Sequence, residues 1–456
     1  MNKGKPFSQM ALKKELVNSL EEMKFESMTP IQEKALPFIL ENRDVIAQAK
    51  TGSGKTYAFG LGILSFIDVS IFKPQALILC PTRELADQVA EDLRKLGKKI
   101  DNLKIATLTG GGFEERQKKS LEHGVHIVVG TPGRTLKFLK KGILKNITFK
   151  HFVLDEADRM LDMGFRESIE AIVSYLPLKR QSLLFSATYP EKIQDLSEDI
   201  LREPRFLKVD TIHNFDVIDE CFVHLNDHKE KAPLLFSFLE TLGSKTCLIF
   251  CKTKLICKNL SDSINRKGFE ALAIHGDLNQ KERSLVLTKF TNGSSRILVA
   301  TDVAARGLDI DKLDVVINFD IPRDKDSYTH RIGRTGRANL KGKAVTFFTD
   351  KEKNSLDQWE NISLTSPLEL TMHKKGIIPP EMKTICIAAG KKQKLRKTDI
   401  LGALVKDVGI ESNDVGRIDL LDHSSYVGIS ASSVGFVLTA LKSKMIKGKR
   451  RRVSQV

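Results

Sequence analysis

Residues 151–158 read HFVLDEAD, a short apolar run that ends in three carboxylates within four residues. An unbroken apolar run is typical of a strand buried on both faces, as in a parallel sheet covered by helices. Ligands of open α/β sheets bind beyond the carboxyl ends of such strands, so acids at this tip can hold a metal ion. The stretch therefore predicts an α/β fold with a binding site where this strand ends.

A glycine-rich loop follows an earlier apolar strand. Residues 44–49 lead directly into KTGSGKT at 50–56, and the following residues have a helical pattern. In a strand, loop and helix of this kind, backbone N–H groups surround a phosphate, Lys55 reaches its outer oxygens, and Thr56 can ligate Mg²⁺. The alternative is an ordinary glycine-rich turn. The loop residues that we expect to contact a nucleotide are Gly52, Ser53, Gly54, Lys55 and Thr56.

With a phosphate loop upstream, the acids of the opening stretch suit phosphoryl transfer. We expect Asp155 to complete the Mg²⁺ site and Glu156 to orient or deprotonate the attacking water. The alternative is that these acids only cap the next helix. Ser186 and Thr188 follow another apolar strand, where their hydroxyls could bond to Asp158 and couple the two strand tips.

Apolar strands alternate with helical patterns through two successive halves of the chain, which predicts two parallel sheets. Beyond Pro379-Pro380 the expected order β-α-β-β-α-β suits a small ferredoxin-like sandwich. We therefore expect an α/β domain at 1–208, a second at 212–360, a connector at 361–380 and a small α+β domain at 381–456.

Composition places this chain among globular proteins of a reducing compartment. Hydrophobic residues make up 41% and charged residues 29% of the 456 residues, and no apolar run approaches the roughly 18 residues of a membrane-spanning helix. The N-terminus lacks the apolar core of a secretory signal, and the six cysteines resemble small core residues. We expect a cytoplasmic protein with no membrane partner and no structural metal.

The charge distribution points to a polyanionic partner. The net charge is +16, and residues 381–456 contain 15 Lys or Arg and 7 Asp or Glu, a balance of +8. We expect this part of the chain to contact phosphate. Residues 330–337 (HRIGRTGR) add a second basic cluster, in which Arg334 and Arg337 could face a γ-phosphate as arginine fingers do. The alternative is a solvated basic loop.

Taken together, these stretches resemble the motifs of a DEAD-box ATP-dependent RNA helicase, in order from about Phe7 to Arg337. Residues 25–32 (FESMTPIQ) are similar to the adenine-recognising Q motif, with Lys24 where glycine is usual. The resemblance implies two RecA-like domains that close on ATP, Mg²⁺ and single-stranded RNA and separate short duplexes locally. It also assigns adenine recognition to Phe25 and Gln32, ribose binding to Asp309, and coupling of ATP to RNA to Asp158, Ser186, Thr188 and His330.

Other loops are similar to the family motifs that grip RNA and link it to ATP. A loop such as Thr-Pro-Gly-Arg is an ordinary turn by itself, and the order of all the loops carries the resemblance. The residues implied to contact RNA are Pro81, Thr82, Arg83, Gly111, Gly112, Thr131, Pro132, Gly133, Arg134, Gln280, Arg283, Thr301 and Asp302.

The C-terminal residues resemble the RNA-binding domain of the DEAD-box protein A (DbpA) subgroup and its YxiN relatives, along 381–396, 399–404 and 446–449. The resemblance implies an atypical RNA-recognition fold that docks on a hairpin of 23S ribosomal RNA. The first expected strand has no aromatic residue and the third has only Tyr426, so base stacking across the sheet is poorly supported. Binding should instead depend on basic side chains, namely Lys391, Lys392, Lys394, Arg396, Lys397, Lys447 and Lys449.

Three functions remain open at the level of sequence. The leading hypothesis is a monomeric RNA-dependent ATPase and local helicase that acts in assembly of the large ribosomal subunit. The second is an ATP-gated RNA clamp whose slow turnover times its release. The third is a general RNA chaperone with a nonspecific basic tail.

Overall fold

The computed structural model describes residues 4–49, 52–111, 114–144, 149–209, 217–305, 310, 313–336, 341–354, 356, 359 and 362–456. These residues form two compact units whose boundary falls between residues 209 and 217. In the described ranges, no helix is both long and apolar enough to cross a membrane.

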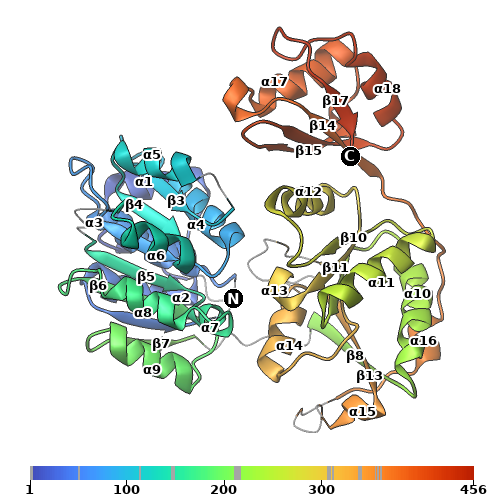
Figure 1. Cartoon of the computed structure of the whole chain (residues 1–456), viewed down its shortest axis with the longest axis horizontal. Coiled ribbons are helices and arrows are strands. Elements are labelled where there is room, and N and C mark those ends of the chain that lie inside the picture. The colour runs from blue at the N-terminus through green and yellow to red at the C-terminus, as the bar shows by residue number, and fades with distance from the viewer. Residues whose placement is uncertain are drawn as a thin grey trace. The chain divides into compact units, whose positions relative to one another are not determined.

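The first unit is built on a parallel sheet of seven strands (Figure 1). Its order is β3 (Ile105–Leu108), β4 (Ile127–Gly130), β2 (Ala76–Leu79), β5 (His151–Asp155), β6 (Gln181–Ser186), β1 (Val45–Gln48) and β7 (Arg205–Lys208). The opening stretch is β5, at the centre, and all five of its residues are buried. The edge strand β7 was not predicted, because most of its side chains are exposed and its sequence has no apolar run.

Helices cover both faces of this sheet. They are α1 (Lys14–Glu22), α2 (Pro30–Leu40), α3 (Lys55–Phe66), α4 (Arg83–Leu96), α5 (Glu114–Glu122), α6 (Pro132–Lys140), α7 (Ala157–Asp162), α8 (Arg166–Val173) and α9 (Glu191–Ile200). Helices α1 to α4 pack in one core with Val153, whereas α6 to α9 pack in another with Phe152 and Leu154. Alternate residues of β5 therefore point into two different cores, which explains its unbroken apolar run.

The second unit begins with a parallel sheet of six strands. Its order is β10 (Ala271–Ile274), β11 (Ile297–Thr301), β9 (Cys247–Cys251), β12 (Val315–Asn318), β13 (Gly342–Thr349) and β8 (Ile218–Leu225). Its main helices are α10 (Lys231–Leu242), α11 (Lys254–Arg266), α12 (Gln280–Thr291), α13 (Asp302–Ala305), α14 (Lys325–Ile332), α15 (Asp350–Lys353) and α16 (Pro367–Thr371).

Parts of the region expected to be a connector pack against this second sheet. Just before that region, Trp359 lies 4.7 Å from the ring of Tyr328 and 6.2 Å from that of Phe222, measured between centroids. Within it, the Ser363 carbonyl accepts a hydrogen bond from the backbone N–H of Phe222 at 3.0 Å. Leu370 of α16 joins the core beneath α10. The chain therefore keeps contact with the second sheet well beyond its last strand.

A small antiparallel sheet completes the second unit. Its order is β15 (Val415–Leu420), β16 (Ser425–Ser430), β14 (Met382–Ile387) and β17 (Val453–Gln455). Helix α17 (Lys397–Gly402) continues as a π-helix over Ala403–Val408, and with α18 (Val434–Ala440) it gives the order β-α-β-β-α-β. The predicted fold class, two parallel-sheet RecA-like domains and a ferredoxin-like domain, is confirmed.

Candidate functional site

Strand order sorts the predicted motifs of the first unit into two neighbouring groups. The phosphate loop follows β1, and Asp155 and Ser186 are the last residues of β5 and β6; these three strands are adjacent in the sheet. The loops predicted to contact RNA follow β2, β4 and β3, which are also adjacent. Because all seven strands are parallel, every one of these loops lies at the same carboxyl edge of the sheet.

The phosphate loop requires glycine at two of its described positions. Gly52 and Gly54 have φ angles of 81° and 93°, in the left-handed region that favours glycine. A Cβ at Gly54 would lie 2.5 Å from Nε2 of Gln32. Gln32 instead donates a hydrogen bond from Nε2 to the Gly54 carbonyl at 3.1 Å. The Q-motif glutamine is thereby placed directly against the start of α3.

Three buried charged groups meet behind this loop. Nζ of Lys55, Oδ1 of Asp155 and Oε2 of Glu156 are all buried and lack a hydrogen-bond partner within the described part of the chain. Burial raises the pKa of Asp155 to about 7, against the opposing effect of the positive charge of Lys55. Glu156 has an ion-pair partner in Arg159, but all three groups have unfilled hydrogen-bonding positions in a buried place, which is costly. A phosphate with a divalent cation would supply the missing contacts. These residues therefore fit a nucleotide and its metal ion.

Glu156 occupies a strained backbone conformation between β5 and α7. Its φ of 54° and ψ of 52° are left-handed, which is uncommon for a residue with a side chain. Its carboxylate lies 3.4 Å from the guanidinium of Arg159, and both side chains are buried. Strain of this kind persists where surrounding contacts hold a residue in a particular place, and it is frequent at functional sites.

Asp158 joins the tips of β5 and β6. Its backbone N–H donates to Oγ of Ser186 at 3.3 Å, and its Oδ2 accepts from the hydroxyl of Thr188 at 3.2 Å. Oδ2 also accepts the backbone N–H groups of Ala187 and Thr188. The structure thus brings together the three residues that we expected to couple the strand tips.

Phe25 stands at the rim of the same region. Its ring is 43% exposed and lies 5.1 Å from the ring of Tyr57, the third residue of α3. The preceding residue, Lys24, has a φ of 59°. Phe25 N–H bonds to the Leu20 carbonyl and Lys24 N–H to the Glu21 carbonyl, which is the Schellman ending of α1. Glycine is usual at Lys24 because this ending needs a left-handed residue.

The loops predicted to contact RNA are held together by polar side chains. The guanidinium of Arg83 lies over Gly110 and Gly111, and a Cβ at Gly111 would lie 1.8 Å from it. Arg134 donates to Oε1 of Gln117 at 3.2 Å. Thr82 and Thr131 precede α4 and α6, Pro81 precedes Thr82, Pro132 opens α6, and Gly133 has open space at its Cβ position. The strand tips therefore bring these loops together at one edge of the sheet, where Pro81, Thr82, Thr131 and Pro132 are buried and Gly133 is exposed.

In the second unit, Asp302 has a partner that the sequence did not indicate. Arg331 donates to both carboxylate oxygens of Asp302, at 2.6 and 2.7 Å. Arg331 also donates to Oδ1 of Asn318 and lies 4.9 Å from the ring of Phe250. Arg331 was missed as a site residue although it belongs to the basic cluster at 330–337. Asp302 is thus engaged within the protein, next to Thr301 at the end of β11.

Helix α12 carries Gln280 as its first residue and Arg283 one turn later. Nη2 of Arg283 donates to the carbonyl of Ala304 in α13 at 2.6 Å. Arg334 follows α14 and is buried, and His330 lies within α14. Three predicted site residues, Gly112, Asp309 and Arg337, lie outside the described residues.

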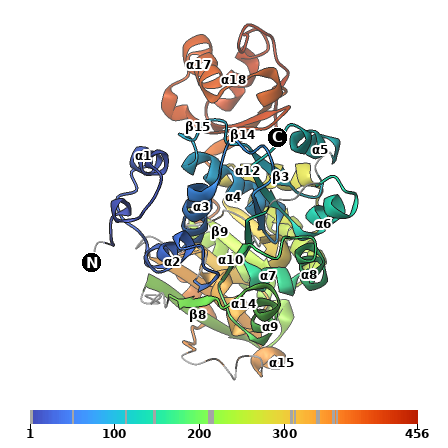
Figure 2. The ribbon, with the colours of Figure 1, turned by 90° about the vertical axis from the view of Figure 1, so that its left-hand side faces the viewer.

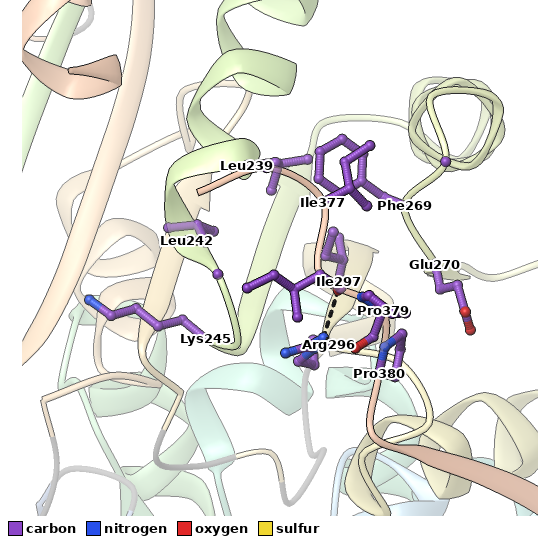
Figure 3. A pocket seen from close by; sticks show the side chains of 14 residues that line it. Leu239, Leu242, Lys245, Phe269, Glu270, Arg296, Ile297, Ile377, Pro379 and Pro380 are labelled. Carbon is purple, nitrogen blue, oxygen red and sulfur yellow. Dashed lines mark hydrogen bonds between the residues drawn. The ribbon is translucent and has the colours of Figure 1, made fainter. Parts of the chain in front are cut away.

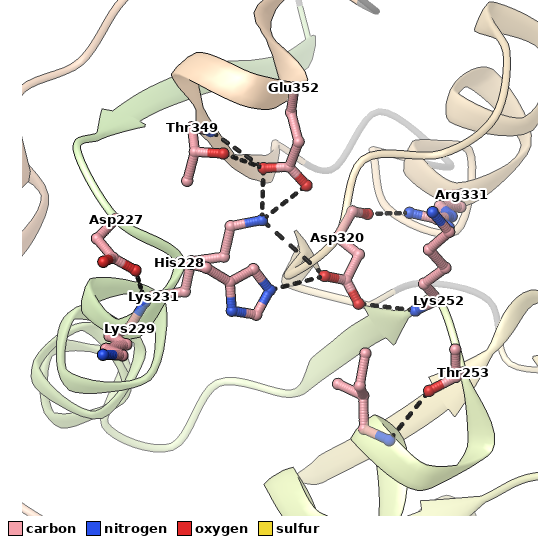
Figure 4. A network of polar contacts seen from close by, with 11 residues as sticks. Asp227, His228, Lys229, Lys231, Lys252, Thr253, Asp320, Arg331, Thr349 and Glu352 are labelled. Carbon is pink, nitrogen blue, oxygen red and sulfur yellow. Dashed lines mark hydrogen bonds and ion pairs between the residues drawn. The ribbon is translucent and has the colours of Figure 1, made fainter.

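A buried lysine organises a polar network at the carboxyl edge of the second sheet, where Arg331 donates to the Asp320 carbonyl (Figure 4). Lys231 is fully buried, and its ammonium donates to Oε2 of Glu352 at 2.9 Å. Asp320 lies 3.9 Å from the same ammonium and 3.6 Å from His228. Asp320 Oδ2 accepts the backbone N–H of Lys252, so this network ties β12 to β9.

Basic side chains of the C-terminal domain gather from two distant segments, 391–397 and 447–450, which we call the basic loops. Lys391, Lys392, Lys394, Arg396, Lys397, Lys447, Lys449 and Arg450 are all exposed. The ammonium of Lys447 bonds to the Lys394 carbonyl and to Oδ2 of Asp399 at 2.9 Å, and the hydrogen bond from Lys447 lowers the pKa of Asp399. In contrast, Tyr426 is only 3% exposed, so its ring is not free to stack on a base.

Comparison with known proteins agrees with this arrangement. The DEAD/DEAH box helicase model matches residues 29–196, the helicase conserved C-terminal domain matches 230–339, and the DbpA RNA binding domain matches 384–455. The chain is 44% identical to the ATP-dependent RNA helicase DbpA of Escherichia coli (strain K12), over 96% of both chains. It is 37% identical to the protein of the same name from Bacillus subtilis (strain 168), over 98% of this chain and 99% of the relative.

A solved structure shows a similar architecture. S. cerevisiae Dbp5 bound to RNA and ADP BeF3 superposes with a TM-score of 0.71 and 33% identity, over 80% of this chain and 95% of that one. From the motif geometry and these relatives together, the chain belongs to the DEAD-box family of ATP-dependent RNA helicases, in the group that carries a DbpA RNA-binding domain.

Proposed function

We propose that this enzyme is an RNA-dependent ATPase and local RNA helicase that its C-terminal domain directs to a hairpin of 23S ribosomal RNA during large-subunit assembly. The observation that carries the targeting is the pair of basic loops, which lie together although about 50 residues separate them in the chain. Exposed ammonium and guanidinium groups from two segments form a surface suited to the phosphates of a folded RNA rather than to one extended strand.

We assign the residues of the first unit to nucleotide chemistry. Lys55 would contact the outer phosphate oxygens, and Thr56 and Asp155 would hold Mg²⁺, which supplies charge neutralisation on the phosphates. Glu156 orients the attacking water and accepts its proton at the carboxylate, where the strained backbone fixes its direction. Arg334 and Arg337 stabilise charge that develops on the phosphate.

The remaining assignments concern adenine, ribose and RNA. Phe25 and Gln32 recognise the adenine, and Asp309 binds the ribose. In the first unit we assign the loops after β2, β3 and β4 to RNA contact. In the second unit we assign the start of α12 and Thr301 to RNA contact. Because Asp302 is paired with Arg331, we assign Asp302 to holding that arginine rather than to direct phosphate contact.

We further propose that the chain works as a monomer in the cytoplasm, and that its domains run from 1 to 208, 212 to 360 and 381 to 456, with 361–380 as connector. The matched family models, at 29–196, 230–339 and 384–455, support this division.

The test compares ATP hydrolysis by the full chain with the ribosomal hairpin and with an unrelated hairpin of equal length. We expect the ribosomal hairpin to stimulate hydrolysis strongly and the unrelated hairpin weakly. The triple variant Lys391→Gln, Lys392→Gln, Lys394→Gln should lose this preference, because it removes three phosphate contacts, each of which contributes to the salt dependence of binding. A matched control, Lys442→Gln with Lys444→Gln, removes charge elsewhere in the same domain and should keep the preference.

Two outcomes would replace the proposal. Equal stimulation by both RNAs in the wild type would indicate a general RNA chaperone. A short duplex placed next to the hairpin distinguishes the other alternative: ATP-dependent binding without strand separation would indicate an ATP-gated clamp.

A further inference from the structure

The aromatic ring that we assign to adenine is in contact with a second ring, which comes from the helix after the phosphate loop. Tyr57 is the third residue of α3, two residues after Lys55. Its ring centroid lies 5.1 Å from that of Phe25, with an angle of 51° between the two ring planes. Tilted aromatic rings at this separation attract each other, because the positive edge of one ring meets the negative face of the other. Phe25 and Tyr57 therefore form a pair at the rim of the candidate nucleotide site.

Within this pair, Tyr57 is held more firmly than Phe25. The Phe25 side chain is 43% exposed, whereas Tyr57 is partly buried and packs against the core that α1 to α4 share. Burial raises the pKa of Tyr57, and the negative charge of Asp92 in α4 acts in the same direction. Tyr57 thus lies close to both Phe25 and α4, and the exposed ring rests on the more buried one.

The segment that leads to Phe25 is fastened to the same helices. Helix α1 packs against α3 and α4, which lie next to each other on one face of the first sheet (Figures 1 and 2). The Glu22 carboxylate bonds to the ammonium of Lys98 at 3.0 Å and to that of Lys99, just after α4. Exposed ion pairs contribute little by themselves, but these add to the Schellman ending that fixes the backbone of Phe25.

The second residue that we assign to adenine is held by different contacts. Oε1 of Gln32 accepts the backbone N–H of Thr29 at 2.8 Å, and Nε2 donates to the Gly54 carbonyl. A side-chain amide has a second N–H and a second lone pair, which suit the edge of a base. An aromatic ring suits the face of a base. The group for the edge is therefore attached to α2 and the phosphate loop, whereas the group for the face is attached to α3 through Tyr57.

We propose that Tyr57 is a positioning residue for Phe25, and that it holds the Phe25 ring in the orientation that stacks on the base of a bound nucleotide. The inference rests on the proposed function, because it concerns how Phe25 meets the adenine. When the ring is already in place, binding orders fewer side-chain conformations, which increases affinity. Since stacking accepts any base, Tyr57 sets the strength of nucleotide binding and leaves the choice of base to Gln32.

Equilibrium binding of Mg-ADP to the full chain, measured by isothermal titration without RNA, tests the proposal. Tyr57→Ala should raise the Kd for ADP roughly three- to tenfold, the range expected for the loss of one aromatic pair. Tyr57→Phe keeps the ring and should bind within about twofold of the wild type. At saturating ATP and RNA, kcat should change by less than about twofold in both variants, because the base and not the reacting phosphate is affected.

A double-mutant cycle with Phe25→Ala separates positioning from general packing. Phe25→Ala should weaken ADP binding at least as much as Tyr57→Ala does, and the double variant should bind no more weakly than Phe25→Ala. If Tyr57→Ala causes the same loss in both backgrounds, Tyr57 acts independently of Phe25 and the proposal is overturned.

Two further outcomes distinguish the inference from the function on which it rests. Normal ADP binding by Tyr57→Ala, with weak binding by Phe25→Ala, would overturn the positioning role and keep Phe25 in adenine recognition. Normal ADP binding by Phe25→Ala would remove Phe25 from adenine recognition, and the inference would fall with that assignment.

The choice between bases gives a readout that a loss of general packing would not predict. In Tyr57→Ala, the Kd for GDP should rise by the same factor as the Kd for ADP, because Gln32 keeps its contacts with Thr29 and Gly54. A changed ratio of the two Kd values would overturn the separation of stacking from base choice.

Two control variants remove side chains away from this pair, and neither should change the Kd for ADP. Tyr175→Ala removes a tyrosine of the first unit that is 46% exposed. Ile377→Ala removes an apolar side chain from a pocket of the second unit, which Phe269 and Ile297 also line (Figure 3). Weaker ADP binding in either control would show that the assay reports general loss of packing, and would overturn the positioning role as the cause.

Tyr57→Leu serves if the alanine variant does not fold. Leucine keeps most of the apolar volume beside α4 but lacks the ring that Phe25 faces, so it should still raise the Kd for ADP by at least about twofold. ADP binding equal to that of Tyr57→Phe would contradict the role of the aromatic pair.

Discussion

Two residues with side chains adopt the left-handed backbone conformation near the nucleotide site, and they do so for different reasons. Lys24 ends a helix in a Schellman motif, where the conformation serves only to turn the chain. Glu156 adopts it between a strand and a helix, where it aims a buried carboxylate. Relief of the backbone strain at Lys24 should leave activity unchanged, whereas substitution of Glu156 should reduce it.

Replacement of Lys24 by glycine should stabilise the first domain by about 0.5 to 1 kcal/mol, because glycine adopts a positive φ without steric cost. Denaturant unfolding of the full chain, followed through the transition of that domain, measures the change. Glu21→Gly, inside the same helix, should instead destabilise by about 1 kcal/mol. Two substitutions of the same sign would contradict this account of Lys24.

Glu156→Gln should leave ATP and RNA binding intact and slow hydrolysis by roughly 10²- to 10⁴-fold, because the amide cannot accept a proton from water. Steady-state ATPase measurements with saturating RNA, together with nucleotide binding by fluorescence, separate the two effects. Glu167→Gln, an exposed acid of α8, is the matched control. Normal turnover in Glu156→Gln would remove this residue from the role of general base.

Asp155→Asn should stabilise the nucleotide-free chain at pH 8. Burial raises the pKa of Asp155 to about 7, so the folded state holds a proton that the unfolded state releases near pH 4. Wild-type stability should therefore fall as pH rises between about 4 and 7. The gain from asparagine, at least about 1 kcal/mol at pH 8, should shrink as pH falls. Thermal unfolding of both proteins across this pH range measures the gain. A gain that does not change with pH would exclude this explanation.

At the scale of elements, two partly buried ion pairs join neighbouring helices. Arg331 joins α14 to the start of α13, and Lys231 joins α10 to α15. Burial alone would raise the pKa of Glu352, but the hydrogen bond and charge of Lys231 outweigh it and lower the pKa. The contribution of this pair should be complete above the ordinary glutamate range and lost as pH falls through the lowered pKa.

Lys231→Met should therefore destabilise the second domain by about 3 kcal/mol near neutral pH, because Glu352 keeps its charge in a partly buried place without its cationic partner, although Thr349 still donates to it. The loss should diminish as pH falls through the lowered pKa of Glu352, which lies below the ordinary glutamate range. Lys229→Met, which changes an exposed lysine two residues earlier, should have little effect. Urea unfolding at pH 7 and at a pH below the ordinary glutamate range makes the comparison, and an equal loss at both pH values would speak against the ion pair.

At the scale of the whole molecule, the strand order separates the loops predicted to bind nucleotide from the loops predicted to bind RNA. The order β3-β4-β2-β5-β6-β1-β7 places nucleotide residues on one half of the carboxyl edge and the predicted RNA loops on the other. The two groups meet between β2 and β5, whose residues pair directly along their length. The small domain carries the basic loops that we propose for RNA binding. It contacts the second domain through Thr384, which accepts from Asn292 after α12, and through Lys383, which donates to Glu270 before β10.

By itself the sequence determined the elements whose signals are local. The unbroken apolar run of β5, the glycines of the phosphate loop and the alternation of strands with helices are consequences of backbone geometry within a few residues, and they predicted the α/β folds correctly. The edge strand β7 and the packing of Trp359 gave no such signal, since the one is mostly exposed and the other depends on distant rings.

Only the tertiary structure decided which residues meet. Asp302 pairs with Arg331, and Thr384 is buried and bonds to Asn292, although the local sequence around one residue of each pair does not indicate the other. Tyr426 is likewise buried without a local signal for it. Such contacts join residues from 29 to 92 positions apart. They depend on strand order and domain packing, because the complete fold, and not the neighbouring sequence, determines which distant segments lie next to each other.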